Sequence, residues 1–156
     1  MGYSTEIAEK LISYLEEKKY YYTFDQDRGI IQMGFNIKCS LGHARCVIDI
    51  KEKLYIVYFI LDVTVPENQR KEVAEYLTRA NYGVICGNFE MDMRDGEVRY
   101  KYTVDNDSCV PSDQLFEKSL AISEIMLLRY GDNLLKVMVG MLNAEEAIKL
   151  VEEGKR

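Results

Sequence analysis

The fold is decided by one stretch in the first half of the chain, residues 30–61, which has the sequence IIQMGFNIKCSLGHARCVIDIKEKLYIVYFIL. Apolar and polar residues alternate on both sides of a polar turn at residues 40–43, as they do in strands with one buried face. A second turn, Lys-Glu-Lys, precedes residues 54–61, so three strands follow one another as hairpins. Because residues 54–61 are apolar on both faces, we expect this third strand to be central and covered on both sides.

Helical periodicity appears on both sides of these strands. Residues 5–19 place apolar side chains on one face at helical spacing and charged ones on the other, which predicts an amphipathic helix. A second helix is expected to open at Pro66, because proline is favoured at the first helical position. Asn81 and Gly83 suit a left-handed helix cap, so this helix is expected to end there.

Two more strands complete the predicted sheet. Residues 84–93 and 98–104 are expected to pair around Asp95-Gly96, a dipeptide typical of the type I′ turn, in which both central residues have positive φ. The chain then follows the order α-β-β-β-α-β-β-α, with a small helix appended. We therefore predict an α+β fold in which a five-stranded, mainly antiparallel sheet packs with helices, in a single domain over residues 1–156.

The C-terminal region is rich in apolar residues. A long helix is expected from Pro111, with a kink at residues 131–133, and a short last helix is expected from an N-cap box made by Asn143 and Glu146. The long segment has more apolar residues than one helix stripe requires, so part of it is expected to face a dimer mate or a client protein. Core filling is the alternative. The candidate interface residues are Met126, Leu127, Leu134, Met138 and Met141.

Charge and composition limit the partners. The chain of 156 residues has a formal net charge of −6 at pH 7, which repels phosphate backbones and anionic lipid, so neither nucleic acid nor a membrane is an expected partner. Its longest uncharged apolar run is residues 54–61, whereas a membrane-spanning helix needs about 20 residues. The N-terminus lacks an apolar export signal and the four cysteines include no C-x-x-C pair, so we expect a cytoplasmic protein with reduced thiols.

One cluster of soft ligands is a weak candidate for a metal site. Cys39, His43 and Cys46 lie close in the sequence, but a zinc site needs a fourth ligand, and a hairpin explains the same residues. The sequence contains neither a phosphate-binding glycine loop nor a nucleophile elbow, and its single histidine is a weak candidate for acid–base chemistry. We therefore predict no catalytic residue, no metal and no cofactor.

Residues 65–104, VPENQRKEVAEYLTRANYGVICGNFEMDMRDGEVRYKYTV, resemble the signature stretch of the bacterial YbjN family, whose members are described as sensory transduction regulators. The positions that carry the resemblance are Pro66, Arg70, Asn81, Gly83, Gly87, Asn88, Phe89, Asp92 and Gly96. These positions are expected to be mainly structural, since glycine and turn residues usually occur where the backbone adopts a particular conformation. The family is similar in fold to type III secretion chaperones, small acidic dimers that bind proteins, and it supplies no catalytic residues to carry over.

These observations predict a non-enzymatic cytoplasmic adaptor or chaperone-like regulator that binds a protein partner and forms a homodimer. The resemblance implies a role in sensory transduction. Two binding modes stay open: an extended peptide added to a sheet edge, and an apolar helix paired with its twin. The alternative function is a small-molecule or metal-responsive sensor that holds its ligand between sheet and helices, with Cys39, His43 and Cys46 as the soft cluster.

Overall fold

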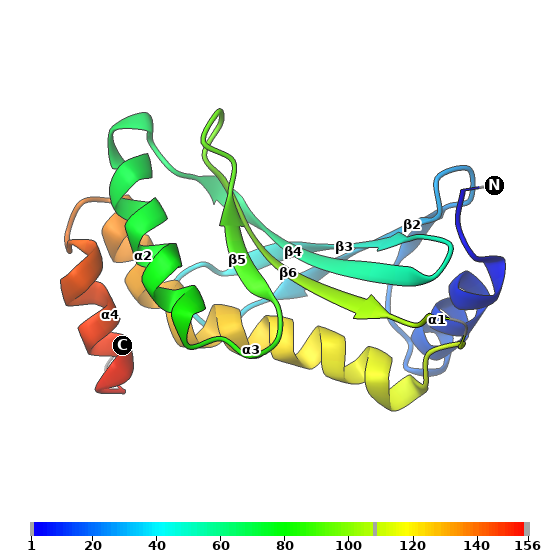
Figure 1. Ribbon diagram of the computed structural model, residues 1–156. Helices are drawn as coiled ribbons and strands as arrows, with labels where there is room; N and C mark the ends of the chain where they lie inside the picture. Colours follow the sequence, from blue (N-terminus) through cyan, green and yellow to red (C-terminus); the bar gives the residue numbers. More distant parts are fainter. Residues whose placement is uncertain (1, 108, 155–156) are drawn as a thin grey trace.

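One antiparallel sheet organises the fold, with its strands in the order β1-β2-β3-β4-β6-β5 (Figure 1). The computed structural model describes residues 2–107 and 109–154. Within these residues the strands are β1 (Thr23–Asp25), β2 (Ile30–Asn36), β3 (His43–Ile50), β4 (Leu54–Thr64), β5 (Asn88–Met91) and β6 (Glu97–Asp105). All neighbouring strands are antiparallel, which confirms the predicted type of sheet.

The sheet has six strands where the sequence predicted five. The additional strand is β1, which lies in the aromatic segment that follows the first helix. Phe24 stands opposite Ile31 of β2, and its ring packs edge-on against Tyr3, so the short strand is held by side-chain packing as well as by its ladder. Strand β5 is shorter than expected, because residues 84–87 form a loop.

The helices gather on one side of the sheet and beyond one edge of it (Figure 1). They are α1 (Thr5–Glu17), α2 (Arg70–Tyr82), α3 (Asp113–Met138) and α4 (Ala144–Glu152), with a 3-10 turn η1 (Glu67–Gln69) before α2. Helix α3 runs along the sheet, whereas α2 and α4 lie beyond β5 and pack against α3. None of the helices among the described residues has the length and hydropathy of a membrane-spanning segment.

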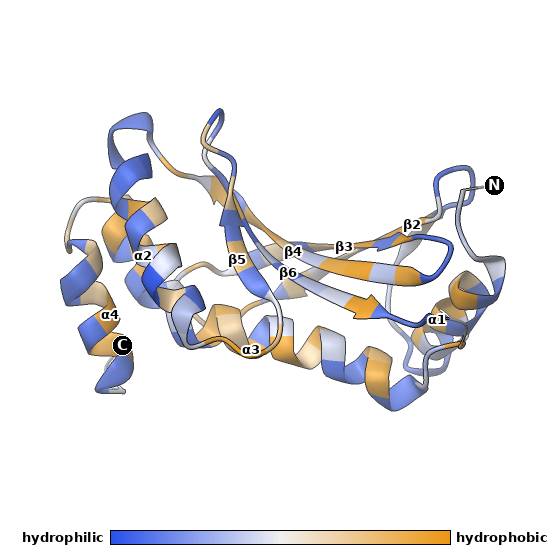
Figure 2. Ribbon diagram, viewed as in Figure 1, coloured by the Kyte–Doolittle hydropathy of each residue, from blue (hydrophilic) through white to orange (hydrophobic). Residues whose placement is uncertain are grey.

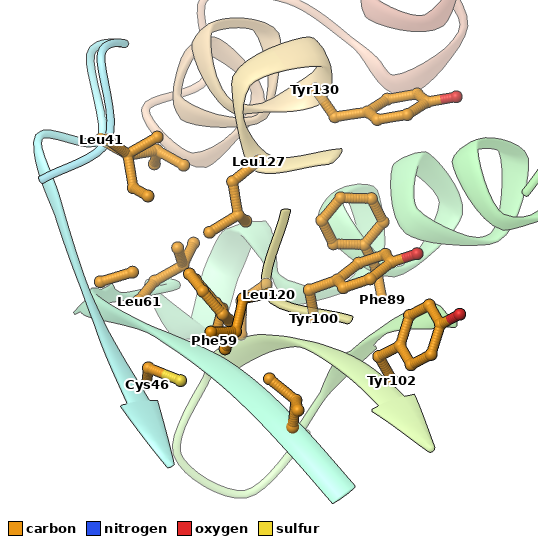
Figure 3. Packing of buried hydrophobic residues seen from close by; sticks show 14 of the residues in the cluster. Leu41, Cys46, Phe59, Leu61, Phe89, Tyr100, Tyr102, Leu120, Leu127 and Tyr130 are labelled. Carbon is orange, nitrogen blue, oxygen red and sulfur yellow. The ribbon is translucent and has the colours of Figure 1, made fainter. Parts of the chain in front are cut away.

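The core lies between α3 and the facing side of the sheet. Figure 3 shows Phe59 and Leu61 of β4 gathered with Leu120 and Leu127 of α3. The ring of Phe116 also meets Tyr55 edge-on at a centroid distance of 5.8 Å. Burial of such side chains is the main favourable term in folding, at roughly 1.5–3 kcal/mol for each large apolar residue.

The expectation that β4 is covered on both sides is wrong. Tyr55, Val57, Phe59 and Leu61 are buried against the helices, while the alternate residues of the strand are only half-buried. In the described part of the chain, helices pack on one face of the sheet alone, so the opposite face is open to solvent (Figure 1). An antiparallel sheet tolerates this arrangement, because its second face can be solvated.

The predicted kink in the long helix is also wrong, since α3 continues from Asp113 to Met138 without a break. Gly131 lies inside this helix, where it allows Leu41 and Cys39 to approach the helix backbone closely. A Cβ atom at this position would lie 2.7 Å from Leu41 Cδ1 and 2.9 Å from Cys39 Sγ. The missing side chain therefore lets the loop between β2 and β3 pack directly on the helix.

Two predicted turn conformations differ from those observed. Gly83 ends α2 with φ of −97°, so the helix does not close with a left-handed cap. The β5–β6 hairpin forms at Asp95-Gly96, but Gly96 alone has positive φ, and its N–H donates to the carbonyl of Asp92. The hairpin loop is therefore longer than a type I′ turn. The N-cap box of Asn143 and Glu146 is confirmed.

Candidate functional site

The open face of the sheet carries a strip of half-buried apolar side chains at its centre. These residues, which we call the open-face strip, are Val47 of β3 and Ile56, Tyr58 and Ile60 of β4. They lie together because alternate residues of a strand share one face and because Val47 stands opposite Tyr58 in the ladder. No helix of the described chain covers them (Figure 1).

Charged side chains border the open-face strip. Ile60 stands between Arg45 of β3 and Arg99 of β6, and Tyr58 stands opposite Lys101. The guanidinium of Arg99 lies over the Tyr58 ring, 4.5 Å from its centroid, in a cation–π contact. The strip is therefore an apolar centre with a charged border, the pattern found in protein interfaces.

Glu90 holds two of these cations in place. Its carboxylate accepts a hydrogen bond from Arg99 Nε at 2.8 Å and forms an ion pair with Lys101. Partial burial alone would raise the pKa of Glu90, but hydrogen bonds from Lys101, Arg99 and Asn88 outweigh that effect and lower it. The carboxylate therefore stays ionised at neutral pH and keeps the Arg99 guanidinium against Tyr58.

A shallow hollow of about 520 Å³ continues the strip onto the β5–β6 hairpin. It is lined by residues 90–94, Glu97 and Arg99. Hydrogen bonds from the side chain and backbone of Arg94 lower the pKa of Asp92 to about 2. The volume would suit a small ligand, but ligand pockets are mostly apolar and this lining is charged, so the hollow resembles the border of a protein-docking surface.

Asn81 closes part of the free edge of β5. This residue lies inside α2, and its Oδ1 accepts from Phe89 N–H at 2.7 Å while its Nδ2 donates to Phe89 O at 2.9 Å. The amide thus takes both backbone groups that an added strand would use at Phe89. The left-handed cap predicted for Asn81 is wrong, and addition of a peptide to the sheet edge is blocked at this residue.

Other positions of the family resemblance also brace the β5–β6 hairpin. Arg70 donates to the carbonyl oxygens of Val65, Met93 and Arg94 at 3.2–3.3 Å, which ties the tip of the hairpin to the start of α2. Gly87 has φ of 77°, and a Cβ there would lie 2.6 Å from the Lys101 carbonyl oxygen. These contacts give both residues a structural role, which is to position the hairpin.

The weak metal candidates do not come together. His43 lies on the open face, where its Nδ1 pairs with Asp62, whereas Cys46 points into the core three residues later. Cys39 lies in the β2–β3 loop, and its thiol contacts the Leu127 carbonyl of α3. Burial raises the pKa of the Cys46 thiol, which disfavours the thiolate that a metal needs. The described residues contain no cluster of three or more metal-ligating side chains.

Three of the five predicted interface residues fill the core instead. Leu127, Leu134 and Met138 are at most 3% exposed, Met126 is half-buried, and Met141 is 71% exposed. The reason is that α3 packs against the sheet and also against α4, so the broad apolar surface that predicted a partner is covered within the chain. Of the five, Met141 is the residue left largely open.

Sequence reasoning missed the open-face strip because residues 54–61 look equally apolar on both faces. The available signal lay in the neighbouring strands. Gln32, Asp49 and Arg99 occupy the open face of β2, β3 and β6, and such polar positions indicate a face in contact with solvent. Register between the strands, which the sequence does not state, was needed to place these residues beside Tyr58.

The fold and the strip define a class of protein: an α+β domain with one antiparallel sheet, helices on one face and an open second face. The chain belongs to the YbjN family, whose model matches residues 8–136 and is described as "Putative bacterial sensory transduction regulator".

A solved structure supports the same fold. The crystal structure of YbjN, "a putative transcription regulator from E. coli", is 12% identical in sequence, with a TM-score of 0.61 over 80% of this chain and 90% of that chain. At this identity the likeness concerns the fold alone. A search of curated proteins finds no match.

Proposed function

We propose that this chain is a non-enzymatic cytoplasmic regulator that binds another protein through the open-face strip. One observation carries the proposal: Val47, Ile56, Tyr58 and Ile60 form an apolar centre on a sheet face that no helix of the described chain covers. Apolar groups grouped in this way lose contact with water when a partner covers them, which favours association.

The strip has the side chains that dominate binding energy in other interfaces. Tyrosine and arginine are enriched among residues whose truncation weakens binding most, and here Tyr58 and Arg99 already stack on each other. Glu90 orders Arg99 before any partner arrives. A partner therefore binds side chains that are already ordered. Less conformational entropy is lost on binding, which improves the affinity for a given interface area.

The acidic groups beside the strip favour binding over catalysis. The lowered pKa values of Glu90 and Asp92 keep both carboxylates ionised, whereas a general acid or base works best with a pKa near the working pH. The net charge of −6 favours a protein partner over nucleic acid. The family description suggests that this binding serves signalling.

Site-specific photo-crosslinking tests the proposal. A chain with p-benzoylphenylalanine in place of Tyr58 keeps an aromatic side chain on the strip, and irradiation in cells is expected to yield one major adduct with a protein. The matched control carries the same group in place of Ile125, an exposed apolar residue on the helical side. Adding Arg45→Glu to the first chain should reduce the adduct.

Equal adducts from both positions, or none from Tyr58, would contradict the proposal. An adduct of twice the chain mass would identify a second copy as the partner. The homodimer predicted from the sequence is a separate part of the proposal, and light scattering on the purified chain over a range of concentrations tests it. A strict monomer would contradict that part alone.

A further inference from the structure

Helix α4 lies in a groove formed by α2 and α3. It runs alongside α2 in the same direction, since its first residue meets Glu72 near the start of α2 and its last turn lies near Arg79 and Tyr82 at the end (Figure 1). Apolar and polar residues alternate along α4 (Figure 2). The helix therefore sits in the groove as an amphipathic ligand would.

The buried face of α4 is narrow. Ala144, Ala147, Ile148 and Val151 are buried at the spacing i, i+3, i+4 and i+7, and two of the four are alanines. A hollow of about 150 Å³ remains between the last turn of α4, the end of α2 and α3. Helix α4 thus occupies the groove, and an open hollow lies beside its last turn.

Among the described residues, few polar contacts tie residues 144–152 to the groove. Its N-cap box is internal, because Asn143 and Glu146 bond to each other's backbone N–H groups. Within the described chain, the hydrogen bond that joins α4 to α2 runs from Ala144 N–H to Glu72 Oε1 at 2.6 Å. None of the ion pairs among the described residues involves residues 144–152.

The connection between α3 and α4 is short and lies at the surface. Helix α3 ends in a Schellman motif, with Gly140 at φ of 74° and a hydrogen bond from Met141 N–H to the Lys136 carbonyl. Val139 and Met141 in this connection are exposed. The family match ends at residue 136, so both walls of the groove belong to the shared fold and α4 follows it.

We propose that the α2–α3 groove is a binding site for an amphipathic helix, and that α4 is its resident ligand, which leaves the groove while the rest of the chain stays folded. The recognised pattern is that of residues 144–151, with small residues at the first two buried positions and branched aliphatic residues at the last two. This site is separate from the open-face strip, because it is formed by helices that lie beyond β5.

Hydrogen exchange on the unaltered full chain tests the opening. The amides of residues 148–152 are expected to exchange at least a hundredfold faster than those of β4, through a local opening whose rate changes little at low denaturant. Glu72→Gln should speed exchange in α4 roughly fivefold, because it removes the charge beside the helix N-terminus, and should leave β4 unchanged. Exchange of α4 only together with β4 would overturn the proposal.

A peptide tests recognition. A fluorescein-labelled peptide of residues 142–154 should bind a full chain that carries Ile148→Asp and Val151→Asp, in which the resident helix no longer competes. It should bind the unaltered chain at least tenfold more weakly, because α4 competes at a high effective concentration. A peptide with the same two aspartates should not bind. Failure of the first peptide on the variant, with its β4 exchange unchanged, would overturn the groove as a binding site.

Discussion

Replacing Asn81 by leucine tests whether one amide side chain closes the edge of the sheet. The side chain of Asn81 bonds both backbone groups of Phe89, at 2.7 and 2.9 Å, and links α2 to β5. Leucine is close to asparagine in size but makes neither bond. The substitution therefore removes the two hydrogen bonds without opening a large cavity.

The expected loss of stability follows from the N–H and the carbonyl of Phe89, which lose their bonds to Asn81. A buried donor or acceptor without a partner costs about 1–3 kcal/mol. The Phe89 carbonyl keeps a weaker contact with Asn88 Nδ2 at 3.3 Å, so its penalty should fall at the low end. Leucine also favours the helix by about 0.5 kcal/mol over asparagine. We expect a net loss of about 2 kcal/mol in the free energy of unfolding, a large share of a stability of typically 5–15 kcal/mol.

Urea unfolding followed by circular dichroism measures this loss. The midpoint should fall while the slope with denaturant stays the same, since the surface exposed on unfolding is unchanged. Asn88→Ala is the matched control, because it removes an amide that contacts the same carbonyl at the longer distance, and it should cost less than about 0.5 kcal/mol. A loss below about 0.5 kcal/mol for Asn81→Leu would refute the reasoning and show that water already satisfies Phe89.

Three other predictions concern backbone strain, acid stability and thiol reactivity. Gly87→Ala should lower the free energy of unfolding in urea by about 2–3 kcal/mol, because φ is 77° and the new Cβ meets a backbone carbonyl. The control Gly83→Ala lies in open space at φ of −97° and should change this free energy by less than about 0.5 kcal/mol. Equal losses for the two variants would contradict the prediction. The pKa of Glu90 is lowered on folding, so its contribution is present above its ordinary pKa of 4.5 and is lost as pH falls. Glu90→Gln should therefore flatten the fall of unfolding free energy below about pH 4.5, and an unchanged slope would refute the assignment. Iodoacetamide should modify the exposed Cys109 in the native chain and leave the buried Cys46 intact until urea unfolds it, as mass spectrometry of peptides would show; early loss of Cys46 would contradict its burial.

Local patterns predicted most of the elements because each depends on residues close in sequence. The alternation in residues 30–61 correctly indicated consecutive hairpins, and the N-cap box at Asn143 fixed the start of α4. The prediction of a kink near Gly131 was wrong because a glycine inside a helical pattern has two structural explanations. It marks either a break or a close approach, and the approaching Leu41 lies far away in the sequence.

The candidate site was less predictable, because it depends on which element covers which surface. The apolar excess of α3 indicated a second contact, and the sequence alone did not show that α4 provides it. The reverse error occurred at β4, where apolar residues on both faces suggested two covering layers. In both cases the number of apolar residues indicated how much surface is apolar. Which element of the chain covers that surface could be seen only in the tertiary structure.

The family stretch and the open-face strip are linked through one strand. Asn81 fixes the backbone of Phe89, and the next residue, Glu90, projects to the opposite face, where it holds Arg99. Arg99 in turn lies over Tyr58 at the centre of the strip. Residues that look purely structural from the sequence therefore set the position of a side chain on the proposed binding face. Phe89 and Glu90 are adjacent residues of β5 whose side chains point to opposite faces, so any shift of the backbone at Phe89 also moves Glu90. The contact between Asn81 and Phe89 therefore helps to fix the position of Arg99 in the open-face strip.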